Sequence, residues 1–193
     1  MDIRALIFRL RSYTPIPFII LILFFAQPTV SSLILGFLFT LLGECIRFWG
    51  VGIIGSETRT TEKVDGSDLF TSGPFSFVRN PLYIGNMLMY CGIAVMSDFW
   101  MPYFSILVFV FFAIQYNIIV HLEEEFLKKK FGEAYVNYCQ TVPRFLPRIT
   151  KAKFSSEKKQ EFNFLRGLKS EVRTLQAFLL LIVALVALKY IRG

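Results

Sequence analysis

Long apolar segments separated by short polar connections make up most of the chain. They cover residues 15–26, 30–54, 82–96, 101–120 and 175–188 and contain almost no charged side chains. A helix of about 20 apolar residues crosses the hydrocarbon core of a bilayer, and several of these segments approach that length. The pattern therefore predicts an all-α, polytopic transmembrane bundle with four membrane helices and, at 175–188, a possible fifth.

The composition favours a membrane protein over a soluble one. Hydrophobic residues make up 54% of the 193 positions, which lies above the usual apolar share of a soluble domain. The mean hydropathy is +0.54. The basic residues ahead of the first apolar segment resemble a secretory signal, but no small-residue cleavage site follows. A second apolar segment begins directly after Gln27 and Pro28, so we expect the first two segments to form a helical hairpin.

The distribution of positive charge predicts the orientation of the chain. The formal net charge is +7, and 12 of the 21 Lys and Arg residues fall within 121–173, whereas the connections at 27–28 and 97–100 carry none. The positive-inside rule then places the N-terminus, the loop 55–79 and the segment after residue 120 in the cytoplasm. Because the basic residues follow this topology, a nucleic-acid partner is not indicated.

The chain divides into one membrane domain and a tail. The membrane domain covers residues 1–150, a basic cytoplasmic linker covers 151–173, and a possible fifth transmembrane or interfacial helix covers 174–193. The linker is rich in Lys, Glu, Ser and Gln, which is typical of a solvated tether or of a surface helix on anionic headgroups.

The cysteine spacing gives no sign of a disulfide framework or a metal site. Cys45, Cys91 and Cys139 lie far apart, and no C-x-x-C pair is present. The sequence therefore predicts no metal ligands.

The second apolar segment carries the few polar residues found inside the predicted spans. Glu44 and Arg47 stand three positions apart, a spacing at which opposite charges pair on a helix. Gly50, Gly52 and Gly55 follow, and because glycine is a poor helix former we expect the helix to break at the interface. Beyond this charged pair the spans offer no ionisable side chains that would mark a transport pathway, which weakens a small transporter as an interpretation.

Residues 73–86 form a polar entry that turns directly into an apolar helix. Pro81 suits the first turn of a helix, where its missing N–H costs nothing, and Asn80 before it is a candidate N-cap. The first turn of a helix presents backbone N–H donors. The start of this helix is therefore a candidate anion site.

The fourth apolar segment ends in Glu123, Glu124 and Glu125. The connection before this segment is short, so the third and fourth segments run antiparallel, and at about 1.5 Å per residue the glutamates reach the interface where the third helix begins. A pocket with N–H donors on one side and carboxylates on the other suits a zwitterion that bears an extra cation, such as S-adenosylmethionine.

Each of these features also has a plain structural explanation. The glutamates can be a water-facing helix end, and Asn80 with Pro81 can be only a cap and a first turn. Arg79 can be an interfacial anchor whose charged end extends to the headgroups, and Tyr83 can belong to an aromatic belt. The residues alone leave these alternatives open.

Two blocks of the sequence carry a resemblance to a known family. Residues 69–85 read LFTSGPFSFVRNPLYIG, and residues 123–147 read EEEFLKKKFGEAYVNYCQTVPRFLP. Together they match the patterns G-x-Y-x-x-x-R-H-P-x-Y and E-E-x-x-L-x-x-x-F-G-x-x-Y-x-x-Y, in order and at the right separation. The chain resembles the integral membrane methyltransferases related to isoprenylcysteine carboxyl methyltransferase and phospholipid methyltransferase. The resemblance covers roughly residues 49–147.

The resemblance implies a cytoplasmic pocket for S-adenosylmethionine. The cofactor-binding residues that it implies are Ser67, Asp68, Leu69, Phe70, Phe75, Asn80, Pro81, Leu82, Tyr83 and Glu123. Glu124, the companion of Glu123, is a candidate base toward an amine acceptor. Arg79 and Arg144 complete the catalytic candidates, because a guanidinium can grip a carboxylate or a phosphate.

Two positions depart from the family pattern. Asn80 stands where the family usually has His, and because Asn does not titrate, a histidine base at this position is excluded. The single histidine, His121, is expected to have an interfacial role. Ile119 stands where isoprenylcysteine enzymes place an arginine for the substrate carboxylate. Arg79, Arg144 or Arg148 can substitute for that arginine, but a phospholipid headgroup or another lipid amine gains weight as the acceptor.

The combined interpretation is an S-adenosylmethionine-dependent methyltransferase. Its acceptor is expected to be membrane-embedded: a lipid, a lipidated cysteine carboxylate or a lipid amine. The alternative is a non-catalytic membrane scaffold that retains the fold. We expect the N-terminus and active site to face the cytoplasm, in a prokaryotic inner membrane or otherwise in an endomembrane. The oligomeric state is not predicted.

Overall fold

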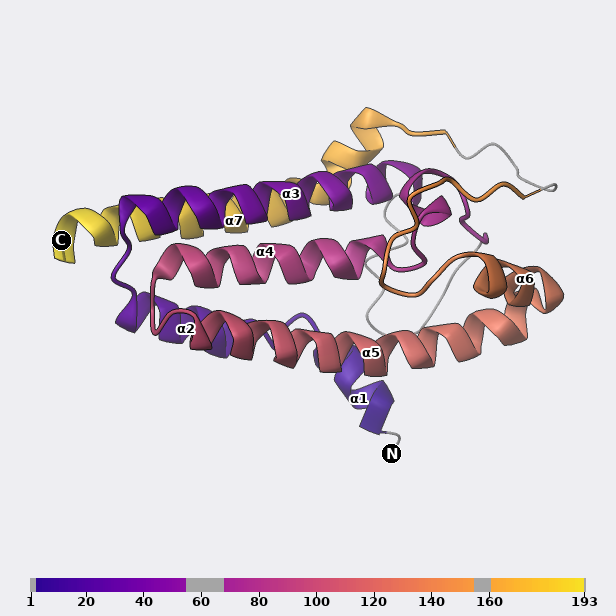
Figure 1. Ribbon diagram of the computed structural model, residues 1–193, viewed down its shortest axis with the longest axis horizontal. Coiled ribbons are helices and arrows are strands. Elements are labelled where there is room, and N and C mark those ends of the chain that lie inside the picture. The colour runs from indigo at the N-terminus through magenta and orange to yellow at the C-terminus, as the bar shows by residue number, and fades with distance from the viewer. Residues whose placement is uncertain (1–2, 55–67, 155–160, 193) are drawn as a thin grey trace.

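The apolar segments form helices, and no strand occurs among residues 3–54, 68–154 and 161–192, which the structure describes. In this computed structural model (Figure 1) the helices are α1 (Ile3–Leu10), α2 (Ile16–Phe25), α3 (Val30–Ile54), α4 (Pro81–Ser97), α5 (Tyr103–Phe131), α6 (Glu133–Thr141) and α7 (Phe164–Arg192). A short 3-10 helix, η2 (Gly73–Ser76), precedes α4. The predicted all-α fold class is confirmed.

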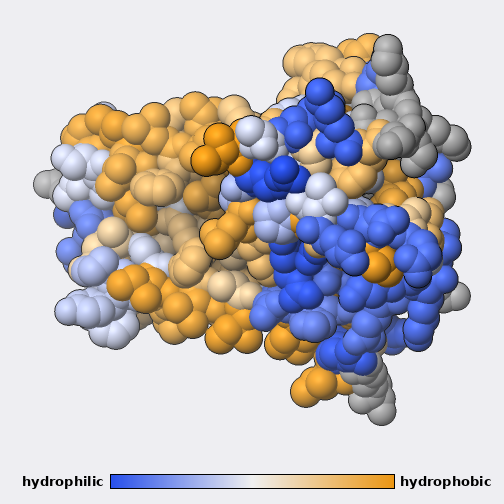
Figure 2. Space-filling model, turned by 45° about the vertical axis from the view of Figure 1, so that its right-hand side comes forward, coloured by the Kyte–Doolittle hydropathy of each residue, from blue (hydrophilic) through white to orange (hydrophobic). Residues whose placement is uncertain are grey.

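Three of the helices, α3, α5 and α7, are long and apolar enough to cross a membrane. Helices α2 and α4 are shorter apolar helices, and at about 1.5 Å per residue α2 reaches roughly half of the hydrocarbon thickness. Apolar side chains cover the surface along the bundle, and polar side chains gather at one end, around the last turns of α5 and α6 (Figure 2). The chain is an integral membrane protein.

Helix α7 is a long apolar helix that packs along α3 (Figure 1). It begins at Phe164, so it starts inside the stretch 151–173 for which the sequence predicts a linker. Much of its apolar surface faces outward, as at Leu179 and Leu180, whereas Leu185 and Glu171 are wholly buried. This helix therefore has one exposed apolar face, which suits contact with lipid, and one face that packs inside the bundle.

The helical hairpins are tied together at the end of the bundle opposite α6 (Figure 1). The Gln27 amide donates to the Ser97 carbonyl at 2.9 Å, and the Thr29 hydroxyl donates to Asp98 Oδ2 at 3.0 Å. Arg192, at the end of α7, donates through Nη1 to the Ala26 carbonyl at 2.8 Å. The turns that follow α2 and α4 and the last turn of α7 therefore meet at this end.

Helices α3 and α4 approach each other through glycines. A Cβ added to Gly43 would lie 2.5 Å from the Gly85 carbonyl oxygen, and one added to Gly85 would lie 2.7 Å from the Gly43 carbonyl oxygen. Two turns further along, a Cβ on Gly92 would lie 2.6 Å from the Gly36 carbonyl oxygen. Small residues at such contacts let backbones pack closely where lipid provides no hydrophobic driving force.

Gly50 and Gly52 do not break α3, which ends at Ile54, and Gly55, the third glycine of the predicted break, lies outside the described residues. Helix α3 runs through Gly50 and Gly52 to Ile54. Both glycines instead make room for neighbours: Leu82 of α4 lies over Gly50, and Phe162 lies over Gly52. Packing therefore outweighs the low helix propensity of glycine at these positions.

Enlarging a glycine of this contact should separate α3 from α4. We expect Gly43→Val to lower the free energy of unfolding by about 3 kcal/mol, because its side chain would meet backbone that cannot rotate away. The matched control is Cys45→Val, which adds bulk at an exposed position of the same helix. Thermal unfolding in detergent should show a large loss for the first variant alone, and equal midpoints would contradict the close approach.

Candidate functional site

The polar segment before α4 sets the start of that helix. Pro81 occupies its first position, as predicted, and is fully buried. The Asn80 side chain makes no capping hydrogen bond and instead donates through Nδ2 to the Arg144 carbonyl at 3.1 Å. The predicted N-cap role of Asn80 is therefore wrong, because its side chain serves a tertiary contact.

Tyr83 and Glu123 join the two sequence blocks across the antiparallel hairpin of α4 and α5. The Tyr83 hydroxyl donates to Glu123 Oε1 at 2.6 Å. Arg11 Nη1 lies 3.7 Å from the same oxygen, and the Tyr83 ring packs against Tyr116 with centroids 4.6 Å apart. The structure thus brings together the helix start and the glutamates that the sequence predicts to meet at one interface.

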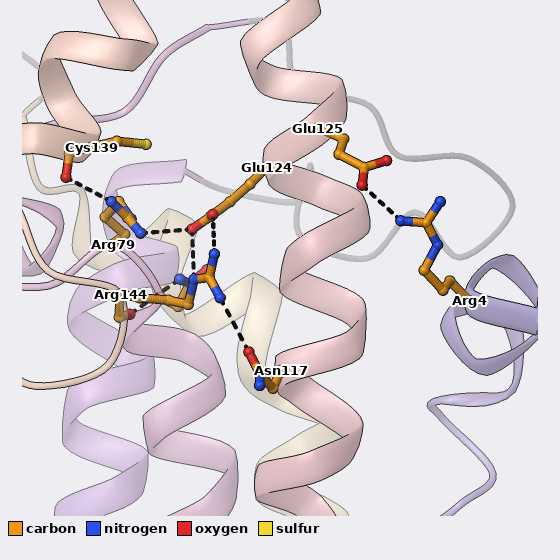
Figure 3. A network of polar contacts seen from close by, with 8 residues as sticks. Arg4, Arg79, Asn117, Glu124, Glu125, Cys139 and Arg144 are labelled. Atoms are coloured by element: carbon orange, nitrogen blue, oxygen red, sulfur yellow. Dashed lines mark hydrogen bonds and ion pairs between the residues drawn. The ribbon is translucent and has the colours of Figure 1, made fainter.

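Glu124 lies between two arginines in the network of Figure 3. Arg79 Nη2 lies 3.0 Å from Glu124 Oε1, while Arg144 donates through Nη2 to Oε2 at 2.6 Å and through Nε to Oε1 at 3.2 Å. Arg79 also donates to the Cys139 carbonyl and Arg144 to Asn117 Oδ1. The three predicted catalytic residues therefore form one cluster.

Glu124 is a buried carboxylate that is paired with two guanidinium groups. The side chain has an exposed fraction of 4%, and each of its oxygens accepts from or pairs with a guanidinium group. The arrangement holds Arg79 and Arg144 in fixed positions. The role of Glu124 as a base stays a prediction.

The chain after α6 runs along the polar segment before α4. The Arg79 amide donates to the Pro143 carbonyl at 2.9 Å, and the Arg148 amide donates to the Phe77 carbonyl at 2.9 Å. The Tyr138 hydroxyl donates to the Phe75 carbonyl at 2.7 Å. Burial raises the pKa of Tyr138, so the hydroxyl keeps the proton that this bond requires.

A small second core supports this crossing. Tyr135, Tyr138, Val142 and Ala152 form a buried cluster on which Leu69 packs. Because α6 contributes Tyr135 and Tyr138 to this cluster, it anchors both polar segments at the end of α5. The tyrosines of the second motif are thus structural supports of the site.

The residues that the resemblance implies as cofactor-binding differ in their exposure and in their contacts. Ser67 lies outside the described residues, and Asp68 is exposed. Phe75 and Leu82 lie over Gly50 of α3, whereas Phe70 is half-buried. Tyr83 and Glu123 face each other, so among these residues they form the direct link between the two blocks.

Two residues near the site, Arg11 and Asn117, were not predicted from the sequence. Arg11, in the turn after α1, approaches Glu123 although it lies more than 100 positions away. Asn117 contacts Arg144, and its position two turns before Glu124 on the same helix could have suggested this. His121 is exposed. Within the described parts of the chain, no group of three or more His, Cys, Asp or Glu side chains could hold a metal ion.

A family model of phospholipid methyltransferases matches residues 31–134. These residues include all of α3 except Val30, the whole of α4 and α5, and both partners of the Tyr83–Glu123 contact. The chain belongs to the phospholipid methyltransferase family. The resemblance described from the two sequence blocks is confirmed.

Proteins with several different names are similar in sequence to this chain. The chain is 31% identical over 118 residues to the cobalt-zinc-cadmium resistance protein CzcN of Cupriavidus metallidurans, covering 61% of this chain and 50% of that protein. It is 30% identical over 119 residues to protein-S-isoprenylcysteine O-methyltransferase B of Arabidopsis thaliana, covering 59% and 58%. It is 35% identical over 83 residues to the Delta(14)-sterol reductase LBR of Gallus gallus, covering 40% and 12%.

The chain thus spans between about an eighth and somewhat over half of the length of these relatives. No solved structure matches the chain.

Removing the charge of Glu124 should destabilise the protein. We expect Glu124→Gln to lower the free energy of unfolding by about 3 kcal/mol, because two half-buried guanidinium groups lose their shared carboxylate. The control is Glu125→Gln, whose partner Arg4 forms an exposed pair with side-chain exposures of 38% and 48%, worth about 1 kcal/mol or less. Thermal unfolding in detergent should show a larger loss of stability for Glu124→Gln than for Glu125→Gln. The reverse order would refute the structural role of the Glu124 ion pairs.

Proposed function

We propose that the protein is an S-adenosylmethionine-dependent methyltransferase that acts on a lipid within the membrane. The observation that carries this proposal is the 2.6 Å contact between Tyr83 and Glu123. It joins the two motifs of the methyltransferase family across the α4–α5 hairpin. Family membership supports the reaction type, and the apolar surface of the bundle supports a lipid acceptor (Figure 2).

The residues at this contact fit the chemistry of the cofactor. Glu123 offers a carboxylate for an ammonium group, and the first turn of α4 offers backbone N–H donors that the Asn80 side chain does not cap. The cofactor would supply an activated methyl group on a positively charged sulfur. The chain would therefore act mainly by holding donor and acceptor in line and excluding water, which are the terms that dominate such a transfer.

Arg79, Glu124 and Arg144 serve the site as a brace in this proposal. Arg79 and Asn80 precede α4 directly, while Glu124 follows Glu123 on α5. By pairing with both arginines, Glu124 ties the start of α4 and the segment after α6 to the end of α5. The brace keeps Tyr83 and Glu123 within hydrogen-bonding distance.

A lipid amine is the acceptor that we favour over a carboxylate. Ile119 takes the place of the family's carboxylate-binding arginine and is fully buried, so it offers no charge. The arginines near the site, Arg79 and Arg144, already share Glu124. We place the reaction at the cytoplasmic face, on the basis of the positive charge near the glutamates.

Binding of S-adenosylhomocysteine tests the cofactor site. We expect the purified protein to bind it in calorimetric titrations, and Glu123→Gln and Tyr83→Phe to weaken binding by about tenfold or more, as for loss of a charge-assisted hydrogen bond. The control is Glu125→Gln, which lies next in the chain but pairs with Arg4. A wild-type protein that binds nothing would favour the non-catalytic scaffold.

Labelled methyl transfer tests the acceptor class. Membranes that contain the protein should incorporate label from S-adenosylmethionine into the lipid fraction, and mild base should release none of this label as volatile methanol, because the bond between a methyl group and nitrogen is not hydrolysed. Base-labile label on a prenylated cysteine would instead identify a methyl ester and overturn the preference for an amine. The Glu123→Gln variant provides the background level.

A further inference from the structure

A buried ion pair connects α7 to the rest of the bundle. Arg47 of α3 donates through Nη2 to Glu171 Oε1 at 2.6 Å, and the Glu171 side chain has no exposed surface. Glu44, which the sequence predicts to pair with Arg47, lies farther away, with Oε2 4.0 Å from Arg47 Nε. Charged groups are costly inside a membrane bundle, so such a pair usually has a function.

Arg47 also reaches α4 and, through it, α5. Its Nη1 donates to Asn86 Oδ1 at 2.6 Å. Asn86 stands one helical turn after Tyr83 on α4, a spacing at which two side chains are neighbours on the same face of a helix. The ring of Tyr116 packs against that of Tyr83, which donates to Glu123. The contacts of Glu171 therefore extend, through Arg47 and Asn86, to the face of α4 that carries Tyr83 at the proposed cofactor site.

We propose that Glu171 is a positioning residue for the Tyr83–Glu123 pair. It fixes one arm of the Arg47 guanidinium, so that the other arm holds Asn86 and, with it, the face of α4 that carries Tyr83. Tyr116 in turn limits how the Tyr83 ring can turn. This inference rests on the proposed function and adds α7, which lies outside the family match at residues 31–134, to the functional unit.

Docking of α7 alone does not explain the buried charges. The helix has separate contacts with α3: the Asn163 amide donates to the Gly52 carbonyl, and Arg166 Nη1 donates to the Ile53 carbonyl at 2.9 Å. Gly167 also packs beneath Phe48. Apolar side chains can replace a buried ion pair without loss of stability, so the pair is better explained by the orientation that it imposes on Arg47.

The test compares two variants of α7. Glu171→Gln removes the charge that holds Arg47, and Arg166→Gln removes a docking contact that does not touch Asn86. The first readout is the ¹⁹F resonance of fluorotyrosine at position 83, assigned by its loss in Tyr83→Phe. We expect this resonance to shift in Glu171→Gln and to stay in place in Arg166→Gln.

The second readout is affinity for S-adenosylhomocysteine. Glu171→Gln should weaken it on the order of tenfold, and in an Asn86→Ala background the same change should have little further effect, because the connection is already broken. Additive losses, or equal losses in Glu171→Gln and Arg166→Gln, would overturn the inference.

The two readouts separate this inference from the proposed function. A wild-type protein that binds no S-adenosylhomocysteine refutes the cofactor site, while the ¹⁹F shift still decides whether Glu171 acts on Tyr83. If Glu171→Gln does not survive extraction, Glu171→Asp keeps the charge but withdraws it from Arg47, and the same shift is expected. An unmoved resonance in a folded Glu171 variant would refute the positioning role.

Discussion

The close approach of α3 and α4 is the contact on which the site depends. Gly43 and Gly85 let the two backbones meet where a side chain would not fit. The missing side chain of Gly85 also makes room for Arg47, whose Cγ would lie 2.5 Å from a Cβ at that position. Arg47 can therefore reach Asn86, the residue that follows Gly85 on α4. The glycine contact thus sets both the helix spacing and the path of Arg47, which links α7 with α4.

The charged residues at the α6 end of the bundle are used mainly to hold chain segments together. Glu124 forms ion pairs with two arginines from segments that lie far apart in the sequence, and Glu125 forms an ion pair with Arg4 of α1. Glu123 differs, because the neutral Tyr83 hydroxyl is its nearest partner and Arg11 stays at 3.7 Å. Of the three adjacent carboxylates, Glu123 is therefore the one whose charge is least compensated. This is the physical reason to place a ligand's cation beside it.

Local patterns predicted the apolar helices α2 to α5, the apolar part of α7 and the meeting of α4 with α5, because apolar length and a short connection suffice to place them. They did not predict α1, α6 or the start of α7. The same reasoning failed where tertiary contacts compete with local preference: Asn80 gives up its cap to reach Arg144, and Gly50 stays helical under Leu82. The Arg47–Glu171 pair spans 124 positions. No periodicity connects such residues, so the sequence alone predicted only the pair with Glu44, whose Oε2 lies 4.0 Å from Arg47 Nε.

The pairing of Arg47 with Glu171 makes α3 and α7 dependent on each other. Removing one member of a buried ion pair leaves an uncompensated charge, at a cost of about 3–5 kcal/mol. That is a large fraction of the stability of a typical domain. A bundle cut back to the family-matched residues 31–134 would leave Arg47 without this carboxylate beside Asn86. In this protein the part that carries the family motifs therefore relies on a helix outside the match for the charge balance next to its site.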